Sequence, residues 1–194
     1  MTVIGIDAGY SRPGLSVVKF TGSTWNNRES ELLFSGFFET ERQAGKNTKV
    51  AVDDARRIRE SCQWMRSIVT QNRPNLVVVE MPLSGGRSAM AIKGMAMAAG
   101  YTVAMMSVLE VDLQFKTFYY SPYDTKRICT GNPHAEKEKM IEAAQRAWPT
   151  IQFPMKKTRS KGVLSQHPGR SEAMADSLCA ILTHVRLNLG KPIL

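Results

Sequence analysis

The sequence predicts a mixed α/β fold in which helices cover both faces of one sheet. Strand patterns come first along the chain, and helical and strand patterns alternate after about residue 50. The segment Leu76–Val79 is entirely apolar, and three of its four residues are β-branched. Such a run is typical of a parallel strand that is buried on both faces. An early group of strands followed by alternating helices and strands indicates a mixed sheet with helices on both sides.

Three strands are expected in the first forty residues. Val3–Ile6 is an apolar run that stops at Asp7, and it predicts a buried strand. Gly14–Phe20 and Leu32–Thr40 predict two more strands. The connections between them are short, so we expect an antiparallel arrangement of these three strands.

Four helices are expected in the rest of the chain. Apolar residues between about Val52 and Asn72 recur at helical spacing, and Pro74 follows them. Asn132 followed by Pro133 is typical of a helix start. The predicted helices span residues 52–72, 88–111, 132–147 and 169–190, with a further strand at Phe115–Ser121 and no clear period over residues 150–170. Four strand segments are predicted before residue 90 and one after it. We therefore expect a sheet of five strands.

The composition indicates a globular, basic protein. The 194 residues are 43% hydrophobic and 22% charged, which suits one folded domain spanning residues 1–194. The formal net charge is +9, from 26 basic and 17 acidic residues. A folded domain this basic usually binds a polyanion, and nucleic acid is the commonest one.

The cysteines and the first residues bear on the compartment. Cys62, Cys129 and Cys179 are odd in number and far apart, so they predict reduced thiols. A reducing compartment follows, which is the cytoplasm, or the host-cell cytoplasm if the protein is viral. The first residues do not form a basic and then apolar leader, and no uninterrupted apolar run approaches the roughly 18 residues of a membrane span. We therefore expect no association with a membrane.

Four acidic residues fall where a catalytic centre could form. Asp7 and Glu80 each end an apolar strand, so they would emerge side by side if those strands are neighbours. Glu172 and Asp176 are four residues apart at the start of the last helix and project from one face of it. Each feature has an ordinary structural alternative, such as a turn-forming Asp or acids that favour a helix N-terminus. The four together favour a functional cluster.

A cluster of four carboxylates needs cations. Two unit charges about 4 Å apart repel by roughly 4 kcal/mol at an effective dielectric constant of 20. Mg²⁺ prefers oxygen ligands and completes its shell with waters and substrate phosphate. Two such ions can activate a water and stabilise the leaving oxygen of a phosphodiester. The acids of this basic protein therefore predict a metal-dependent nuclease without an organic cofactor.

Four segments resemble the RuvC family of Holliday junction resolvases, within the RNase H-like nuclease superfamily. They are Ile4–Gly9 (IGIDAG), Val77–Glu80 (VVVE), Asn132–Lys139 (NPHAEKEK) and Ala175–His184 (ADSLCAILTH). The order and spacing of these segments match the family along nearly the whole chain, and the last segment is the most specific. The resemblance implies an RNase H-like sheet and a homodimer that cuts four-way DNA junctions with two Mg²⁺ ions per site, for which Mn²⁺ would substitute.

The resemblance also implies roles for particular residues. Asp7, Glu80 and Asp176 correspond to three family acids. The fourth family acid lies three residues before the last, where this chain has Ala173, and Glu172 is one residue earlier. Among basic and apolar positions, Lys126 and Lys137 correspond to residues near the scissile phosphate, and Leu83 lies near the place of a junction-inserting aromatic residue.

A basic segment precedes the last helix. No Asp or Glu occurs between Glu142 and Glu172. We expect this segment to contact DNA phosphates, although a solvated loop is the alternative. Its candidate DNA-binding residues are Lys156, Lys157, Arg159, Lys161 and Arg170. The arginines of the first predicted helix, among them Arg57, are expected on a solvated face, and His184 is expected to be structural.

Three other functions share parts of this pattern. A related RNase H-like nuclease could act on flaps, replication branches or an RNA–DNA hybrid. A protein could also bind junctions without cutting them. An actin-like or sugar-kinase-like ATPase has a similar Asp-x-Gly turn, but it needs a second glycine-rich phosphate loop and a longer chain, and neither is visible here.

Overall fold

The computed structural model describes residues 1–43, 48–82, 88–157 and 164–192. Its centre is a five-stranded sheet with the strand order β3-β2-β1-β4-β5. The strands are β1 (Thr2–Asp7), β2 (Gly14–Phe20), β3 (Ser30–Phe37), β4 (Leu76–Glu80) and β5 (Lys116–Tyr120). The pairs β1–β2 and β2–β3 are antiparallel, and β1–β4 and β4–β5 are parallel. The predicted mixed sheet is thus confirmed.

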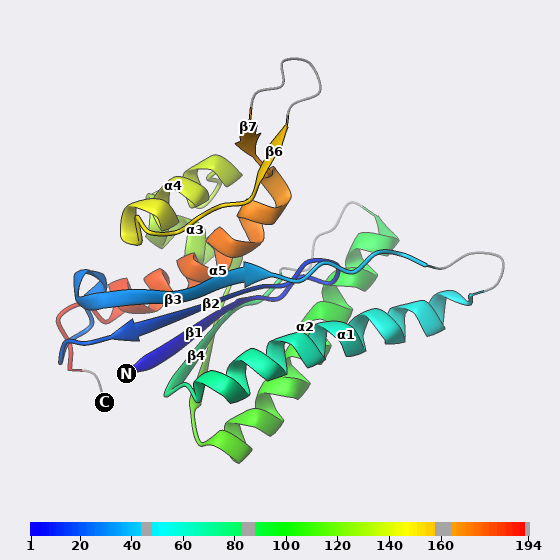
Figure 1. Ribbon diagram of the computed structural model, residues 1–194, viewed down its shortest axis with the longest axis horizontal. Helices are drawn as coiled ribbons and strands as arrows, with labels where there is room; N and C mark the ends of the chain where they lie inside the picture. The colour runs from blue at the N-terminus through cyan, green and yellow to red at the C-terminus, as the bar shows by residue number, and fades with distance from the viewer. Residues whose placement is uncertain (44–47, 83–87, 158–163, 193–194) are drawn as a thin grey trace.

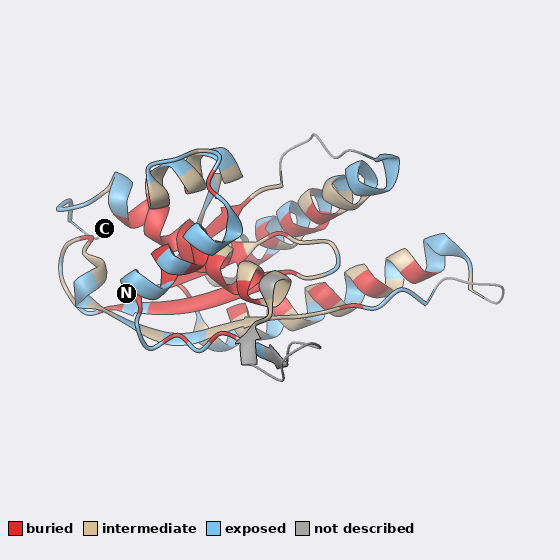
Figure 2. Cartoon of the chain, turned by 90° about the horizontal axis from the view of Figure 1, so that it is seen from above, coloured by how far each residue is buried: buried red, intermediate tan, exposed pale blue. Residues whose placement is uncertain are grey.

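Helices cover both faces of the sheet (Figure 1). One face carries α1 (Val50–Asn72) and α2 (Ala89–Leu113), and the other carries α3 (Pro122–Thr130), α4 (Lys137–Ala147) and α5 (Pro168–Leu187). Alternate residues of β1 enter the two cores: Val3 packs on the α5 side, and Ile4 packs on the α1 side. Figure 2 shows the buried residues concentrated along the central strands and α5.

Two glycines let α5 lie directly against the sheet. A Cβ atom on Gly5 would be 2.0 Å from the carbonyl oxygen of Ser177, and one on Gly14 would be 1.9 Å from that of Ala173. Both distances are far below van der Waals contact, so no larger residue fits at either position without movement. The hydroxyls of Ser16 and Ser177 lie 2.7 Å apart across the same contact. The sequence thereby holds the acidic end of α5 close to β1 and β2.

The structure differs from the sequence prediction in four elements. The nine-residue α3 was not predicted because a helix this short shows little periodicity; Ser121 caps it and Pro122 begins it. The helix expected from Pro133 starts at Lys137, because Asn132 to Ala135 form a turn that the Ala135 amide closes on the Asn132 carbonyl oxygen at 3.1 Å. The segment expected to lack periodicity contains a short hairpin of β6 (Met155–Lys157) and β7 (Leu164–Gln166). A short 3₁₀ helix, Asn27–Glu29, precedes β3.

Helix α2 is apolar on nearly all sides. Its length and composition would allow it to cross a membrane. Only 28% of its most apolar stretch is buried in the protein. The prediction from uninterrupted apolar runs missed this, because Lys93 and glycines interrupt the helix. Core helices of proteins outside membranes can have the same length and composition. Its exposed apolar residues include Ile92, Val103, Val108 and Val111, at 49%, 39%, 61% and 77% exposed.

Candidate active site

Asp7 and Glu80 are neighbours at one end of the sheet. They are the last residues of β1 and β4, and they pair directly in the parallel register. The chain turns away immediately afterwards, where the Ala8 amide donates to the Glu80 carbonyl oxygen at 3.2 Å. The Tyr101 hydroxyl of α2 donates to the Gly9 carbonyl oxygen at 2.7 Å and fixes this turn. Two apolar strands thus place two carboxylates side by side, as the sequence predicted.

The acids of α5 complete a negatively charged cluster. Burial raises the pKa of Asp7 well above its usual range, and the charges of Asp176 and Glu172 raise it further. Burial also raises the pKa of Asp176, as do the charges of Glu80 and Glu172. Asp7 and Asp176 thus each have a pKa that is raised by the charges of two other acids in the cluster. The structure brings together all four acids that were predicted from the sequence.

Glu80 is the most enclosed of the four acids. Only 6% of the residue is exposed, and its Oε2 atom has no hydrogen-bond partner. Burial and the charge of Asp7 raise the pKa of Glu80 to about 8. An unpartnered buried carboxylate oxygen is costly when it is charged, so a bound cation would stabilise the ionised form of Glu80.

The two lysines implied by the family resemblance lie beside the acids. The charges of Lys126 in α3 and Lys137 at the start of α4 both lower the pKa of Asp176. The Lys137 ammonium is 2.6 Å from Oε2 of Glu172. The lysines do not neutralise the cluster, since the pKa of Asp176 remains raised despite them.

The donor set suits hard divalent cations. Within the described ranges, no three His, Cys, Asp or Glu side chains are arranged so that they could hold a metal ion by themselves. Mg²⁺ does not need such a cage, because it keeps several waters and takes one or two carboxylates plus substrate phosphate. The raised pKa values and the unpartnered oxygen of Glu80 are what cations would relieve.

Replacing Glu80 by glutamine should stabilise the metal-free protein at pH 8. The folded pKa of about 8 exceeds the ordinary 4.5, so the folded state binds a proton more tightly than the unfolded state. Stability is therefore lost as pH rises from about 4.5 to 8. Each tenfold difference in proton affinity between the two states corresponds to about 1.4 kcal/mol. We expect the Tm of Glu80→Gln in EDTA to exceed that of the wild type by at least roughly 4 °C at pH 8.

The control for this prediction is the same pair of proteins at pH 4.5, where both side chains are largely neutral. Their Tm values should then nearly coincide, as measured by thermal unfolding followed by circular dichroism. A Tm difference that is equal at both pH values would contradict the assigned burial of the Glu80 charge.

The structure describes only some of the other residues that were predicted to bind DNA. Leu83, Arg159 and Lys161 lie outside the described residues. Lys156 and Lys157 belong to β6, and their side chains are likewise not described. Arg170 was expected to face DNA phosphates, but its guanidinium is 2.9 Å from Oε2 of Glu39, which also pairs with Arg12. This ion pair ties the start of α5 to the segment after β3.

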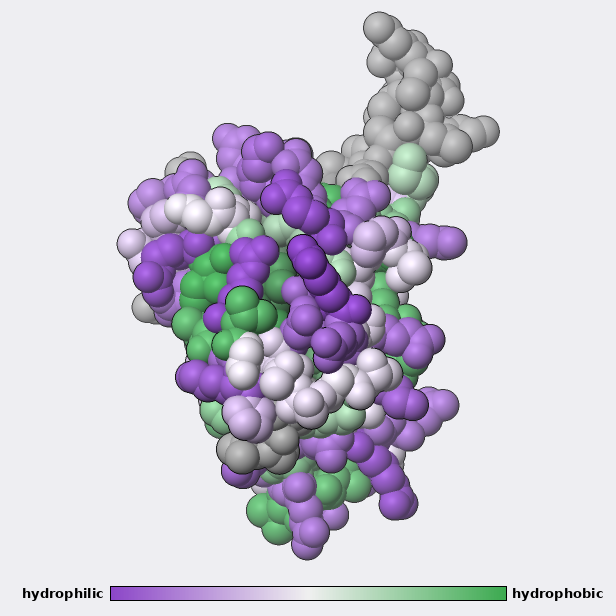
Figure 3. All heavy atoms as spheres, turned by 90° about the vertical axis from the view of Figure 1, so that its left-hand side faces the viewer, coloured by the Kyte–Doolittle hydropathy of each residue, from purple (hydrophilic) through white to green (hydrophobic). Residues whose placement is uncertain are grey.

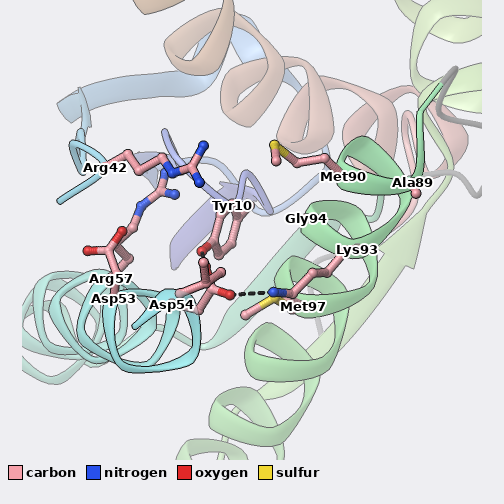
Figure 4. A pocket seen from close by; sticks show the side chains of 11 residues that line it. Tyr10, Arg42, Asp53, Asp54, Arg57, Ala89, Met90, Lys93, Gly94 and Met97 are labelled. Atoms are coloured by element: carbon pink, nitrogen blue, oxygen red, sulfur yellow. Dashed lines mark hydrogen bonds and ion pairs between the residues drawn. The ribbon is translucent and has the colours of Figure 1, made fainter. Parts of the chain in front are cut away.

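A polar network that joins Tyr10 to helices α1 and α2 was not predicted from the sequence (Figure 4). Arg57 is only 8% exposed, so its expected place on a solvated face is wrong. Its guanidinium lies 4.3 Å from the centre of the Tyr10 ring. The Tyr10 hydroxyl donates to Asp54, which also pairs with Lys93 of α2. The network lines a cavity of about 310 Å³. The apolar spacing of α1 gave no signal that one arginine among several is buried.

A cavity of about 510 Å³ lies directly against Asp7. The β1 turn, from Asp7 to Ser11, forms one wall of this cavity, and the first half of α2 forms the other. The candidate site thus has space for a substrate beside Asp7.

Comparison with known proteins identifies the family. A profile of the family described as crossover junction endodeoxyribonuclease RuvC matches residues 3–148. The chain belongs to this family. It is therefore a nuclease, and RuvC-family nucleases depend on divalent metal ions. The match extends from β1 through α4 and ends before α5, so the position of Glu172 and Asp176 at the site comes from the structure.

Individual relatives agree with the family. The crossover junction endodeoxyribonuclease RuvC of Synechococcus sp. (strain WH7803) is 26% identical over 183 residues, which cover 94% of this chain and 97% of that protein. The structure of T. thermophilus RuvC in complex with a Holliday junction substrate matches with a TM-score of 0.66 and 21% identity, and covers 100% of this chain and 99% of that one. The yeast mitochondrial Holliday junction resolvase Ydc2 matches with a TM-score of 0.59 and 14% identity, over 96% and 78% of the two chains. These structures share the RuvC fold of this chain.

Proposed function

We propose that this chain resolves Holliday junctions by hydrolysing phosphodiester bonds with two Mg²⁺ ions held by Asp7, Glu80, Glu172 and Asp176. The observation that carries the proposal is the direct pairing of Asp7 with Glu80 at the ends of two parallel strands, with both acids of α5 electrostatically coupled to them. Mn²⁺ should substitute for Mg²⁺, because both ions suit carboxylate and water ligands.

The four acids would act together as ligands of the two ions. When bound, two such ions activate a water and stabilise the leaving oxygen of the phosphodiester. Asp7 and Asp176 would bind the ions, and Glu80 and Glu172 would complete the ligand set. Cleavage would leave a 5′-phosphate and a 3′-hydroxyl.

Basic residues would position the DNA backbone. Lys126 and Lys137 lie beside the acids, so they are proposed to contact phosphates next to the scissile bond. Lys137 would then exchange its ion pair with Glu172 for a phosphate. The residues proposed for further DNA contacts are Leu83, Lys156, Lys157, Arg159, Lys161 and Arg170, of which Arg170 must share its charge with Glu39. We also propose that residues 1–194 form one nuclease domain acting in the cytoplasm, or in a host-cell cytoplasm.

A homodimer through α2 would supply the second active site that symmetric cutting of a junction requires. The exposed apolar residues Ile92, Val103 and Val111 are spaced by 11 and 8 residues, which is about 3.1 and 2.2 helical turns, so they lie within roughly 100° of one another around the helix. Ala96 and Gly100 lie between them and permit a second helix to approach closely. Exposed apolar patches on proteins mark interaction sites, and an isologous contact brings the same helix of both subunits together.

Replacing Val103 by glutamate should separate the subunits. The added charge would be buried without a partner in the middle of the interface, and removing such a charge from water is costly. We expect the dissociation constant to rise by at least about a hundredfold, measured by sedimentation equilibrium. Gln145→Glu, on the exposed side of α4, is the matched control and should remain dimeric. A Val103→Glu protein that stays dimeric would place the interface elsewhere.

A substrate panel tests the proposed function. Equal concentrations of four-way junction, flap, RNA–DNA hybrid and plain duplex are incubated with the protein and Mg²⁺, and initial rates are compared. We expect the junction to be cut at least about tenfold faster than the others. Faster cutting of a flap or hybrid would favour the related nucleases instead, and junction binding without any product would favour a non-catalytic binding protein.

A further inference from the structure

A separate cavity of about 770 Å³ lies at the opposite end of the sheet from the carboxylates. Met1 and Leu76 line it, at the starts of β1 and β4, whereas Asp7 and Glu80 end these strands. A molecule bound there would lie a full strand length from the candidate active site. Figure 3 views this end of the molecule, where apolar side chains gather and hydrophilic side chains border them. We call it the β5 cavity.

Aromatic rings form a preorganised wall of the β5 cavity. The ring of His184 in α5 packs edge-on against Trp25, with 4.8 Å between ring centroids, and lies 4.6 Å from the ring of Phe118. The Tyr120 hydroxyl is 3.0 Å from Nδ1 of His184. Burial lowers the pKa of His184 to about 4, so the ring is neutral at pH 7. Phe118 remains 39% exposed, which leaves an aromatic surface open to an incoming apolar group.

The charged side chains that line the described part of the β5 cavity all have one sign. Its described lining includes Lys116 and Lys191, which are both exposed, and contains no Asp or Glu. A ligand that carries negative charge next to an apolar group therefore complements this surface. A second copy of this chain, with a net charge of +9, fits it poorly.

A free strand edge lies beside the cavity. Strand β5 ends the five-stranded sheet and pairs only with β4 among the described strands. Lys116, Phe118 and Tyr120 are alternate residues of β5 and all line the cavity. An extended peptide added along β5 would pair with its backbone and direct alternate side chains toward the aromatic wall. Nucleic acid lacks the backbone amides for such pairing, which favours a protein ligand.

We propose that the β5 cavity binds an extended segment of a partner protein, in which an aromatic residue is flanked by acidic residues, and that this segment adds a strand to β5. The aromatic residue would pack on Phe118 and the His184 ring. The flanking carboxylates would pair with Lys116 and Lys191. Because this site is remote from the acids, a partner could hold the nuclease without occupying its substrate site.

Fluorescence anisotropy with the full chain tests the proposal. The probe is a fluorescein-labelled peptide, Asp-Asp-Val-Phe-Val-Asp-Asp, and the comparison peptides carry lysine in place of aspartate or alanine in place of phenylalanine. We expect saturable binding of the probe below about 1 mM and at least about tenfold weaker binding of both comparison peptides. No saturable binding of the probe, or equal binding of the lysine peptide, would overturn the proposal.

Charge reversal in the protein locates the site. The double variant Lys116→Glu/Lys191→Glu should weaken probe binding at least about tenfold, while Arg66→Glu, an exposed change on α1, should leave it within about twofold. The double variant should keep its Tm and its junction cleavage, which separates this test from the proposed nuclease function. The assignment would be overturned if the double variant bound the probe as tightly as the wild type does. It would also be overturned if oligothymidylate displaced the probe as strongly as the unlabelled peptide does.

Backbone methylation of the probe tests strand addition. Alternate peptide nitrogens point toward β5, so methylation of one alternating set should abolish binding and methylation of the other set should preserve it. Equal affinity of the two methylated peptides would show that no strand is added and would overturn that part of the proposal.

Discussion

Asp7→Asn is expected to abolish Mg²⁺-dependent cleavage of a four-way junction while it stabilises the metal-free protein. Asp7 ends β1, pairs with Glu80 and is coupled to both acids of α5. The amide keeps the shape of the side chain but loses the charge that binds cations. Loss of a residue that only supports a metal ligand typically lowers metal affinity or activity by about 10–100-fold. Loss of a ligand itself should therefore lower the cleavage rate by at least about a hundredfold.

The stabilisation distinguishes this result from misfolding. Burial and the charges of Asp176 and Glu172 raise the pKa of Asp7, so the ionised side chain destabilises the metal-free fold near neutral pH. The variant should therefore show a higher Tm than the wild type in EDTA at pH 8, and it should bind junction DNA with similar affinity. Glu31→Gln, an exposed change on β3, should alter neither rate nor Tm. An Asp7→Asn protein that cuts at the normal rate would contradict the site assignment.

Gly14→Ala should damage both stability and cleavage, although it adds only one carbon. The new Cβ would lie 1.9 Å from the carbonyl oxygen of Ala173 in α5, so helix and strand must separate. Overpacking of a core typically costs 1–3 kcal/mol, and about 2 kcal/mol corresponds to a Tm decrease of roughly 4–8 °C for a chain of this size. Glu172 and Asp176 flank the displaced carbonyl along the helix, so cleavage should fall with it.

A glycine in a less crowded place provides the control. A Cβ on Gly94 of α2 would be 3.4 Å from the Tyr10 ring, which is an ordinary contact distance. Gly94→Ala should keep or raise the Tm, because alanine favours a helix more than glycine does. If Gly14→Ala unfolds at the same temperature as the wild type, then α5 is not held as closely to β2 as the structure indicates.

The sheet and the acids could be predicted because their signals are local. An apolar run that ends in one acid, as at Asp7 and Glu80, marks both a buried strand and the place where its side chain leaves the core. The spacing of Glu172 and Asp176 likewise shows that they share a helix face. The family resemblance then indicated the neighbours of the strands, and the register of β1 with β4 confirmed that placement.

The remaining features depend on contacts between distant segments. The burial of Arg57 follows from Tyr10 and Thr40, which meet α1 only in the folded chain. The pairing of Arg170 with Glu39 joins residues 131 positions apart. The aromatic wall around His184 combines residues of β5, α5 and the segment after β2. No periodicity within one segment encodes such contacts, so the sequence placed Arg57 on a solvated face incorrectly and did not predict the ion pair of Arg170 with Glu39.

Mapping the cleavage products of a synthetic four-way junction tests the central claim most directly. Wild-type protein is incubated with the junction under three conditions: in Mg²⁺, in EDTA, and in EDTA followed by excess Mn²⁺. Each of the four DNA strands of the junction is labelled in turn. We expect paired nicks at symmetric positions in two strands, with 5′-phosphate and 3′-hydroxyl ends, in Mg²⁺ and Mn²⁺ but not in EDTA. Single unpaired nicks, equal cutting of plain duplex, or cutting that persists in EDTA would contradict a two-metal junction resolvase built on Asp7 and Glu80.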